Sequence, residues 1–122
     1  MPDGRRLGAD VIRRDHGGRQ LDGTVSAIRA LPDIATAVGG RCDILLDSGV
    51  RRGTDILKAR ALGASGVMIG RAYVWGLAAA GEPGVDKAIA LLRAELETAM
   101  MLLGETELGD LEPDMLISAG AP

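Results

Sequence analysis

The sequence predicts an α/β fold in which parallel strands alternate with helices. Three short apolar runs, at residues 9–12, 43–46 and 66–69, are rich in branched side chains, and glycine-rich turns follow them. Runs of this length and composition are typical of buried parallel strands. Because helical patterns separate the runs, we expect β/α units joined by right-handed crossovers. Three such units do not close an eight-unit barrel, which takes about 250 residues, so we expect either an open three-stranded layer or one part of a larger structure.

Two helices are expected between these strands. Residues 24–38 carry apolar side chains at helical spacing. Pro32 is expected to break or restart that helix, because proline lacks an amide hydrogen and crowds the preceding turn. Residues 54–62 form a second, shorter helix, for which Thr54 or Gly53 is available as the N-terminal cap.

The last helix is the clearest element, beginning at Pro83-Gly84 and ending at Gly104. Arg93 and Glu97 are spaced to form a surface ion pair, and the carboxylates of this helix are assigned to a solvated face. Residues 105–122 are acidic and then small, and we expect this tail to be partly ordered. The apolar stripe of the helix consists of Val85, Ile89, Leu92, Leu96, Ala99, Met100 and Leu103.

Composition and charge argue against several classes of function. The 122 residues suffice for one modest domain, and one Trp with one Tyr cannot build a surface of stacked aromatics for nucleic acid. The net charge of −3 gives no reason to expect a polyanionic partner. No apolar run approaches the ~20 residues that cross a bilayer, and the start of the chain is charged where a signal peptide is apolar. We expect a cytoplasmic protein without an integral membrane segment.

The remaining unusual side chains have structural interpretations. Cys42 is the single cysteine, which fits a reducing compartment, and it is interpreted as structural. Tyr73 and Trp75 are expected to pack against the wall of the barrel or the last helix. One His and one Cys cannot form a metal-ligand cluster, so no metal site is expected.

The first candidate for chemistry is the loop that follows the first strand. It contains His16 and Arg19, separated by two glycines. An imidazole takes up a proton near neutral pH, and a guanidinium can clamp a carboxylate with two parallel hydrogen bonds. Because ligands bind at the carboxyl ends of strands in α/β folds, this pair suits a small hydroxy acid. Alone, each side chain could equally cap a turn or lie in solvent.

The second and third candidates follow the next two strands. The second strand leads into Asp47, Ser48, Gly49, Val50 and Arg51, where glycine frees the backbone and helix-start amides attract phosphate. The third strand leads into Gly70 and Arg71. Either loop alone could be an ordinary connection, but adjacent late strands of β/α barrels often share one phosphate site.

Together, three segments resemble the FMN-dependent 2-hydroxy-acid dehydrogenase family, which includes glycolate oxidase, lactate oxidase or dehydrogenase, and mandelate dehydrogenase. The segments are His16-Gly17-Gly18-Arg19-Gln20-Leu21-Asp22, Asp47-Ser48-Gly49-Val50-Arg51-Arg52-Gly53 and Gly70-Arg71. The resemblance implies that residues 1–104 form the last three β/α units of a TIM (β/α)8 barrel, which is then incomplete. The composition of residues 105–122 separately indicates an acidic, flexible tail.

The resemblance also implies a role for each matching residue. His16 matches the catalytic histidine, which takes a proton from the substrate, and Arg19 matches the arginine that binds the substrate carboxylate. The residues that match the FMN-binding loop and its phosphate-binding partner are Asp47, Ser48, Gly49, Val50, Arg51, Gly70 and Arg71. One segment departs from the family, because Arg13-Arg14-Asp15 stands where Val-Ser-Asn is usual.

The function implied is that of a C-terminal fragment of an FMN-dependent oxidoreductase, inactive in isolation, which oxidises a small 2-hydroxy acid of the lactate, glycolate or mandelate type to the 2-oxo acid. The alternative is a non-catalytic, truncated module that binds flavin or phosphate and self-associates through exposed sheet edges as a homo-oligomer. A third candidate is another flavin or phosphate barrel, such as isopentenyl-diphosphate isomerase or inosine-phosphate dehydrogenase, against which the His-Gly-Gly-Arg string argues.

Overall fold

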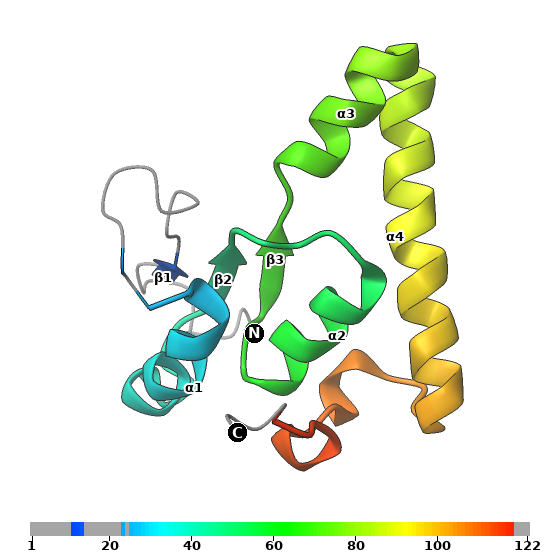
Figure 1. Cartoon of the computed structure of the whole chain (residues 1–122). Coiled ribbons are helices and arrows are strands. Elements are labelled where there is room, and N and C mark those ends of the chain that lie inside the picture. Colours follow the sequence, from blue (N-terminus) through cyan, green and yellow to red (C-terminus); the bar gives the residue numbers. More distant parts are fainter. Residues whose placement is uncertain (1–10, 14–22, 24, 119–122) are drawn as a thin grey trace, which may run out of the picture.

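The computed structural model of the chain describes residues 11–13, 23 and 25–118, which form a small α/β unit with the helices α3 (Arg71–Ala80) and α4 (Glu82–Leu103) on one side (Figure 1). Two short 3-10 turns follow the last helix. In chain order the elements are β1 (Val11–Arg13), α1 (Ala27–Val38), β2 (Ile44–Asp47), α2 (Gly53–Ala61), β3 (Gly66–Met68), α3 (Arg71–Ala80), α4 (Glu82–Leu103), η2 (Leu108–Asp110) and η3 (Pro113–Met115).

The three strands form one parallel sheet in the order β1-β2-β3, which confirms the predicted strands and their direction. The register pairs Arg13 with Leu46 between β1 and β2, and Asp47 with Met68 between β2 and β3. The carboxyl ends of all three strands therefore lie at the same edge of the sheet (Figure 1). That edge is where an α/β fold places its ligands.

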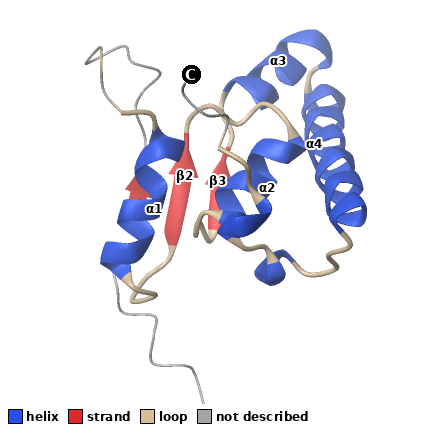
Figure 2. Cartoon of the chain, turned by 60° about the horizontal axis from the view of Figure 1, so that its bottom comes forward, coloured by secondary structure: helices blue, strands red, loops and turns tan. Residues whose placement is uncertain are grey.

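Helices α1 and α2 cover one face of this sheet (Figure 2). On β2, Ile44 and Leu46 are buried against this layer, whereas the alternate residue Leu45 is partly exposed on the other face. Leu31 of α1 is fully buried in the same cluster, with Ala59 of α2 beside it. Burying a leucine of this kind stabilises the fold by roughly 1.5–3 kcal/mol, so this layer anchors β2 and the loop that follows it.

Pro32 does not break α1, and the prediction that it would is wrong. The helix runs from Ala27 to Val38 with Pro32 inside it. An interior proline costs roughly 3 kcal/mol through its missing hydrogen bond and its crowding of the previous turn. The buried positions of α1 before and after it, Leu31 and Val38, contribute an opposing burial energy of similar size. Tertiary packing therefore outweighs the local preference.

Helices α3 and α4 lie side by side as an antiparallel hairpin beyond the sheet (Figure 1). Their contact depends on two glycines, because a Cβ on Gly84 would meet the carbonyl oxygen of Gly76, and a Cβ on Gly76 would meet the backbone of Gly84. The predicted bounds of α4 are confirmed, with Gly104 as a left-handed C-cap at φ 78°. Trp75 of α3 is 74% exposed, contrary to the expectation that it would pack.

The segment after α4 folds back beneath α2 (Figure 1). Leu111 is buried in a second apolar cluster with Leu57 of α2 and Met100 of α4. Arg60 of α2 donates hydrogen bonds to the carbonyl oxygens of Ala64, at 2.6 Å, and Leu108, at 3.5 Å. These contacts join α2, α4 and the 3-10 turns into one packed layer.

Cys42 is half-buried and packs against the cluster around Leu31. Over residues 11–13, 23 and 25–118, no helix has both the length and the apolar character needed to cross a bilayer. Within the same residues, no three His, Cys, Asp or Glu side chains are grouped as metal ligands would be.

Candidate functional site

The register of the sheet brings two of the predicted loops together. Asp47 and Met68 are paired neighbours at the ends of β2 and β3. Gly49 and Gly70 each follow two residues after that pair, so both loops leave the same edge of the sheet side by side. The helix α3 begins directly after Gly70, with Arg71 as its first residue. Residues far apart in the chain thus share one edge, as expected for a ligand site in a β/α fold.

The loop between β2 and α2 has an unusual backbone. Ser48 has φ 98° and Gly49 has φ 82°, two successive residues in the region that favours glycine. For a residue with a side chain, this conformation costs roughly 1–2 kcal/mol. Val50 is 8% exposed and anchors the loop to the core. A strained residue held beside a well-packed one is common where a loop is shaped for a ligand.

Three successive amides at the end of this loop are held by two carboxylates. The amides of Arg51 and Arg52 both donate to Oδ2 of Asp55, each at 3.0 Å. The amide of Gly53 donates to Oε2 of Glu95, at 2.7 Å. Arg52 is therefore the N-cap residue of α2, and the prediction that Thr54 or Gly53 would cap it is wrong. The helix begins earlier because Asp55 reaches back to the amides before it.

Glu95 is the site residue that the sequence interpretation missed. The carboxylates of the last helix were assigned to a solvated face, and Glu95 is exposed there, but its carboxylate also accepts a hydrogen bond at the start of α2. The approach is close because Gly53 has no side chain, and a Cβ there would meet the backbone of Leu92 and Leu96. This contact joins positions 42 residues apart in the sequence. It could not be predicted from the spacing of Glu95 within its helix or from a local motif.

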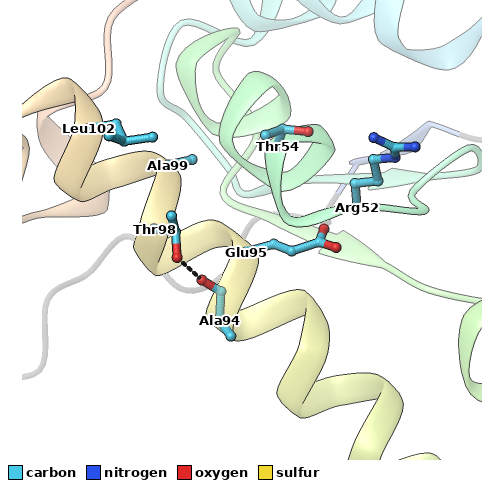
Figure 3. Close-up of a pocket in the computed structure, with 7 residues that line it drawn as sticks. All are labelled: Arg52, Thr54, Ala94, Glu95, Thr98, Ala99 and Leu102. Carbon is cyan, nitrogen blue, oxygen red and sulfur yellow. Dashed lines mark hydrogen bonds between the residues drawn. The ribbon is translucent and has the colours of Figure 1, made fainter.

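A shallow, open cleft lies between the start of α2 and α4, and it encloses about 390 Å³ (Figure 3). Arg52 and Glu95, which carry opposite charges, both line it, and the hydroxyl of Thr98 donates a hydrogen bond to the carbonyl oxygen of Ala94 at 2.8 Å. The cleft therefore adjoins the loop after β2 from the side of α4. Its lining consists of Arg52, Thr54, Ala94, Glu95, Thr98, Ala99 and Leu102.

The predicted site residues fall into two groups. His16 and Arg19 lie outside the described residues. The guanidinium-bearing residues Arg51 and Arg71 are exposed at the edge of the sheet, so their charges are available to a ligand. The group that the structure brings to this edge is Asp47, Ser48, Gly49, Val50, Arg51, Gly70 and Arg71.

The chain is a parallel β/α unit with a strained loop and two exposed arginines at the carboxyl edge of its sheet. The sequence pattern of the FMN-dependent dehydrogenase family matches residues 5–118, and the chain belongs to that family. It is a family of enzymes, flavin-dependent oxidoreductases whose cofactor is FMN.

The chain is similar in sequence and structure to several characterised proteins. The chain is 55% identical over 107 residues to the pre-mycofactocin synthase of Mycolicibacterium smegmatis, which covers 87% of this chain and 27% of the relative. It is 50% identical over 106 residues to the L-lactate oxidase of a Nostoc species, which covers 87% and 29%. It superimposes on the structure of a mandelate oxidase variant with an FMN adduct at a TM-score of 0.81, with 47% identity and coverage of 85% and 33%. The chain thus spans about a third or less of these relatives.

Proposed function

We propose that the chain supplies the last three β/α units of the barrel of an FMN-dependent oxidoreductase that oxidises a small 2-hydroxy acid to the 2-oxo acid. One observation carries the proposal: the loops after β2 and β3 lie side by side at the carboxyl edge of the sheet, through the pairing of Asp47 with Met68. Family membership and the similarity to lactate oxidase and mandelate oxidase supply the reaction class.

The chemistry of the donors at this edge fits the phosphate of FMN. A phosphate monoester carries close to two negative charges, and it is bound by backbone amides, hydroxyls and guanidinium groups. The loop offers the Ser48 hydroxyl and the backbone of Gly49, while Arg51 and Arg71 offer exposed positive charge. Gly70 has open space where a Cβ would lie, so a ligand can approach its backbone closely. We assign the phosphate to these residues, with Asp47 and Val50 fixing the start and middle of the loop.

We assign the substrate roles to His16 and Arg19, which follow β1 in the sequence. His16 takes a proton from the substrate, a role that a neutral imidazole can perform. Arg19 binds the substrate carboxylate through two parallel hydrogen bonds. FMN, when bound, accepts the two electrons that leave the substrate. These assignments rest on the sequence and on family membership, and β1 leads towards the same edge as β2 and β3.

Flavin titration tests the binding half of this proposal. The purified chain is titrated into FMN and, separately, into riboflavin, while flavin fluorescence is followed. We expect FMN to bind more tightly than riboflavin and Arg71→Ala to remove most of that difference. The matched control is Arg29→Ala, which removes another exposed charge, from α1, a helix that lies apart from α3 (Figure 1). Equal affinity of the wild-type chain for the two flavins would contradict a phosphate site at this edge.

Turnover tests the chemical half. Lactate, glycolate and mandelate are offered together with FMN and an artificial electron acceptor, both to this chain and to a longer protein that contains it within a complete barrel. We expect turnover in the complete barrel, abolished by His16→Ala with FMN binding largely intact. Loss of FMN binding and turnover together in that variant would contradict the role given to His16. Flavin binding without any turnover in the complete barrel would favour a non-catalytic flavin-binding module.

A further inference from the structure

We propose that Glu95 is a positioning residue for the phosphate-binding loop: from α4, it holds the end of that loop in the conformation that receives the ligand. The inference rests on the proposed function for the identity of the ligand. The hydrogen bond between Glu95 and the amide of Gly53 is independent of that proposal. Glu95 is not among the residues to which we assign the phosphate or the substrate, so its proposed effect passes through the backbone of the loop.

The first step of the argument is the hydrogen bond. Oε2 of Glu95 accepts the amide of Gly53 at 2.7 Å, a short bond with a charged acceptor. Gly53 is the residue at which the loop becomes helix α2. The first amides of a helix have no partner within it, and an unpartnered one at a packed junction such as this would be costly. Glu95 therefore fixes the point where the loop ends.

The second step is the packing around that bond. Gly53 is buried, and the backbone of α4 approaches it so closely that a Cβ would collide with the carbonyl oxygen of Leu92 and the amide of Leu96. Glu95 lies on the same turn of α4 (Figure 3). The start of α2 is thus held against α4 both by contact and by a hydrogen bond. The strained backbone of Ser48 and Gly49 lies four to five residues before this fixed point.

The third step is electrostatic. Asp55 and Glu95 together place two carboxylates on the first amides of α2, where the positive end of the helix dipole lies. A phosphate bound by this loop therefore meets a helix start that is already occupied by negative charge. The charge of the phosphate must therefore be balanced by arginines, and Arg51 and Arg71 are exposed at this edge of the sheet. The charge of Glu95 opposes the phosphate, whereas its hydrogen bond orders the loop, and a substitution can separate the two effects.

The experiment compares three variants of the full chain. Glu95→Ala removes both the charge and the hydrogen bond, Glu95→Gln removes the charge and keeps an acceptor oxygen, and Glu97→Ala is the control. Glu97 lies two residues away on α4, pairs with the exposed Arg93 and does not reach α2. Amide hydrogen exchange followed by mass spectrometry is measured without flavin over residues 47–53, with α1 as the internal reference.

We expect exchange over residues 47–53 to become about tenfold faster in Glu95→Ala, with α1 unchanged, because loss of the bond permits local opening. Glu95→Gln and Glu97→Ala are expected to match the wild type. Unchanged exchange in Glu95→Ala would overturn the inference. Faster exchange in α1 as well would show general destabilisation. That result would also overturn the inference, unless Glu95→Gln kept wild-type exchange both in residues 47–53 and in α1.

Flavin titration of the same variants then tests the link to the ligand. We expect Glu95→Ala to weaken FMN about tenfold and riboflavin hardly at all, since riboflavin lacks the phosphate. Glu95→Gln should bind FMN at least as tightly as the wild type. Equal losses for both flavins, or no loss for FMN, would overturn the positioning role. If the wild-type chain binds neither flavin, the proposed function fails at this site, and the exchange measurement alone decides whether Glu95 orders the loop.

Discussion

Because α2 and α4 are in close contact at Gly53, Gly53→Ala should destabilise the fold by about 1.5–5.5 kcal/mol. A helix usually gains stability when alanine replaces glycine, by roughly 0.5–1 kcal/mol. Here the added Cβ would meet the backbone of Leu92 and Leu96 and the Cβ of Glu95. Backbone atoms cannot rotate aside as a side chain can, so the two helices must separate. Such overpacking costs about 1–3 kcal/mol, and weakening of the charged hydrogen bond to Glu95 adds about 1.5–3 kcal/mol before the helix gain is subtracted.

The assay is urea unfolding followed by circular dichroism, with Gly109→Ala as the matched control. A Cβ on Gly109 would meet nothing within 4 Å, and its φ is outside the left-handed region, so that variant should keep the wild-type midpoint. With a slope of about 2 kcal/mol per molar urea, a loss of 3 kcal/mol lowers the midpoint by about 1.5 M. A Gly53→Ala midpoint indistinguishable from that of Gly109→Ala would refute the reasoning, because it would mean that α2 and α4 do not approach as closely as the structure places them.

Three further predictions concern other special positions, each read by the same urea unfolding. Ser48→Gly should stabilise the chain by about 0.5–1 kcal/mol, since relief of the strain at φ 98° outweighs the added freedom of the unfolded chain; a destabilised variant would mean that the hydroxyl makes a stronger contact than the strain costs. Gly84→Ala should cost about 1–3 kcal/mol, because its Cβ would overlap the carbonyl oxygen of Gly76, and an unchanged midpoint would contradict the α3–α4 contact. Arg93→Ala should change stability by less than about 0.5 kcal/mol although Arg93 pairs with Glu97 at 3.0 Å, because both side chains are largely exposed. A larger loss there would show that the pair is less hydrated than its exposure indicates.

Much of the fold follows from local patterns in the sequence. The strands were predictable from their short runs of branched apolar residues, although β3 is only partly buried, and the bounds of α4 followed from a proline near its start and Gly104 at its end. Pro32 was misread because a local rule about proline ignores what the rest of the helix buries. Leu31, beside it, is fully buried, and no inspection of residues 24–38 alone gives the weight of that contact.

Some features of the site were likewise predictable from the sequence, and others required the structure. Its glycines and arginines were predictable, since a β/α loop that binds an anion needs a permissive backbone and positive charge, and both are visible as letters in the sequence. Their arrangement needed the register of the sheet, which pairs Asp47 with Met68. Glu95 could not have been found this way. A glutamate on a long amphipathic helix has the same local pattern whether or not its carboxylate bonds the start of a neighbouring helix. Here the bond depends on the close approach of α2 and α4 at Gly53, which only the packing of the whole fold determines.

The loop after β2 joins a strained segment to a fixed end, and the two features depend on each other. Ser48 keeps an unfavourable backbone conformation, which can persist only if the residues on both sides prevent its relaxation. Before it, β2 is buried through Leu46; after it, Val50 is buried and the amide of Gly53 is bonded to Glu95. A loop with one free end would relax by rotating that end, so the stability of the α2–α4 contact sets how much strain the loop can hold. Removal of the Glu95 carboxylate on α4, far along the chain from the glycines and arginines of the site, should therefore alter the site's affinity for an anion.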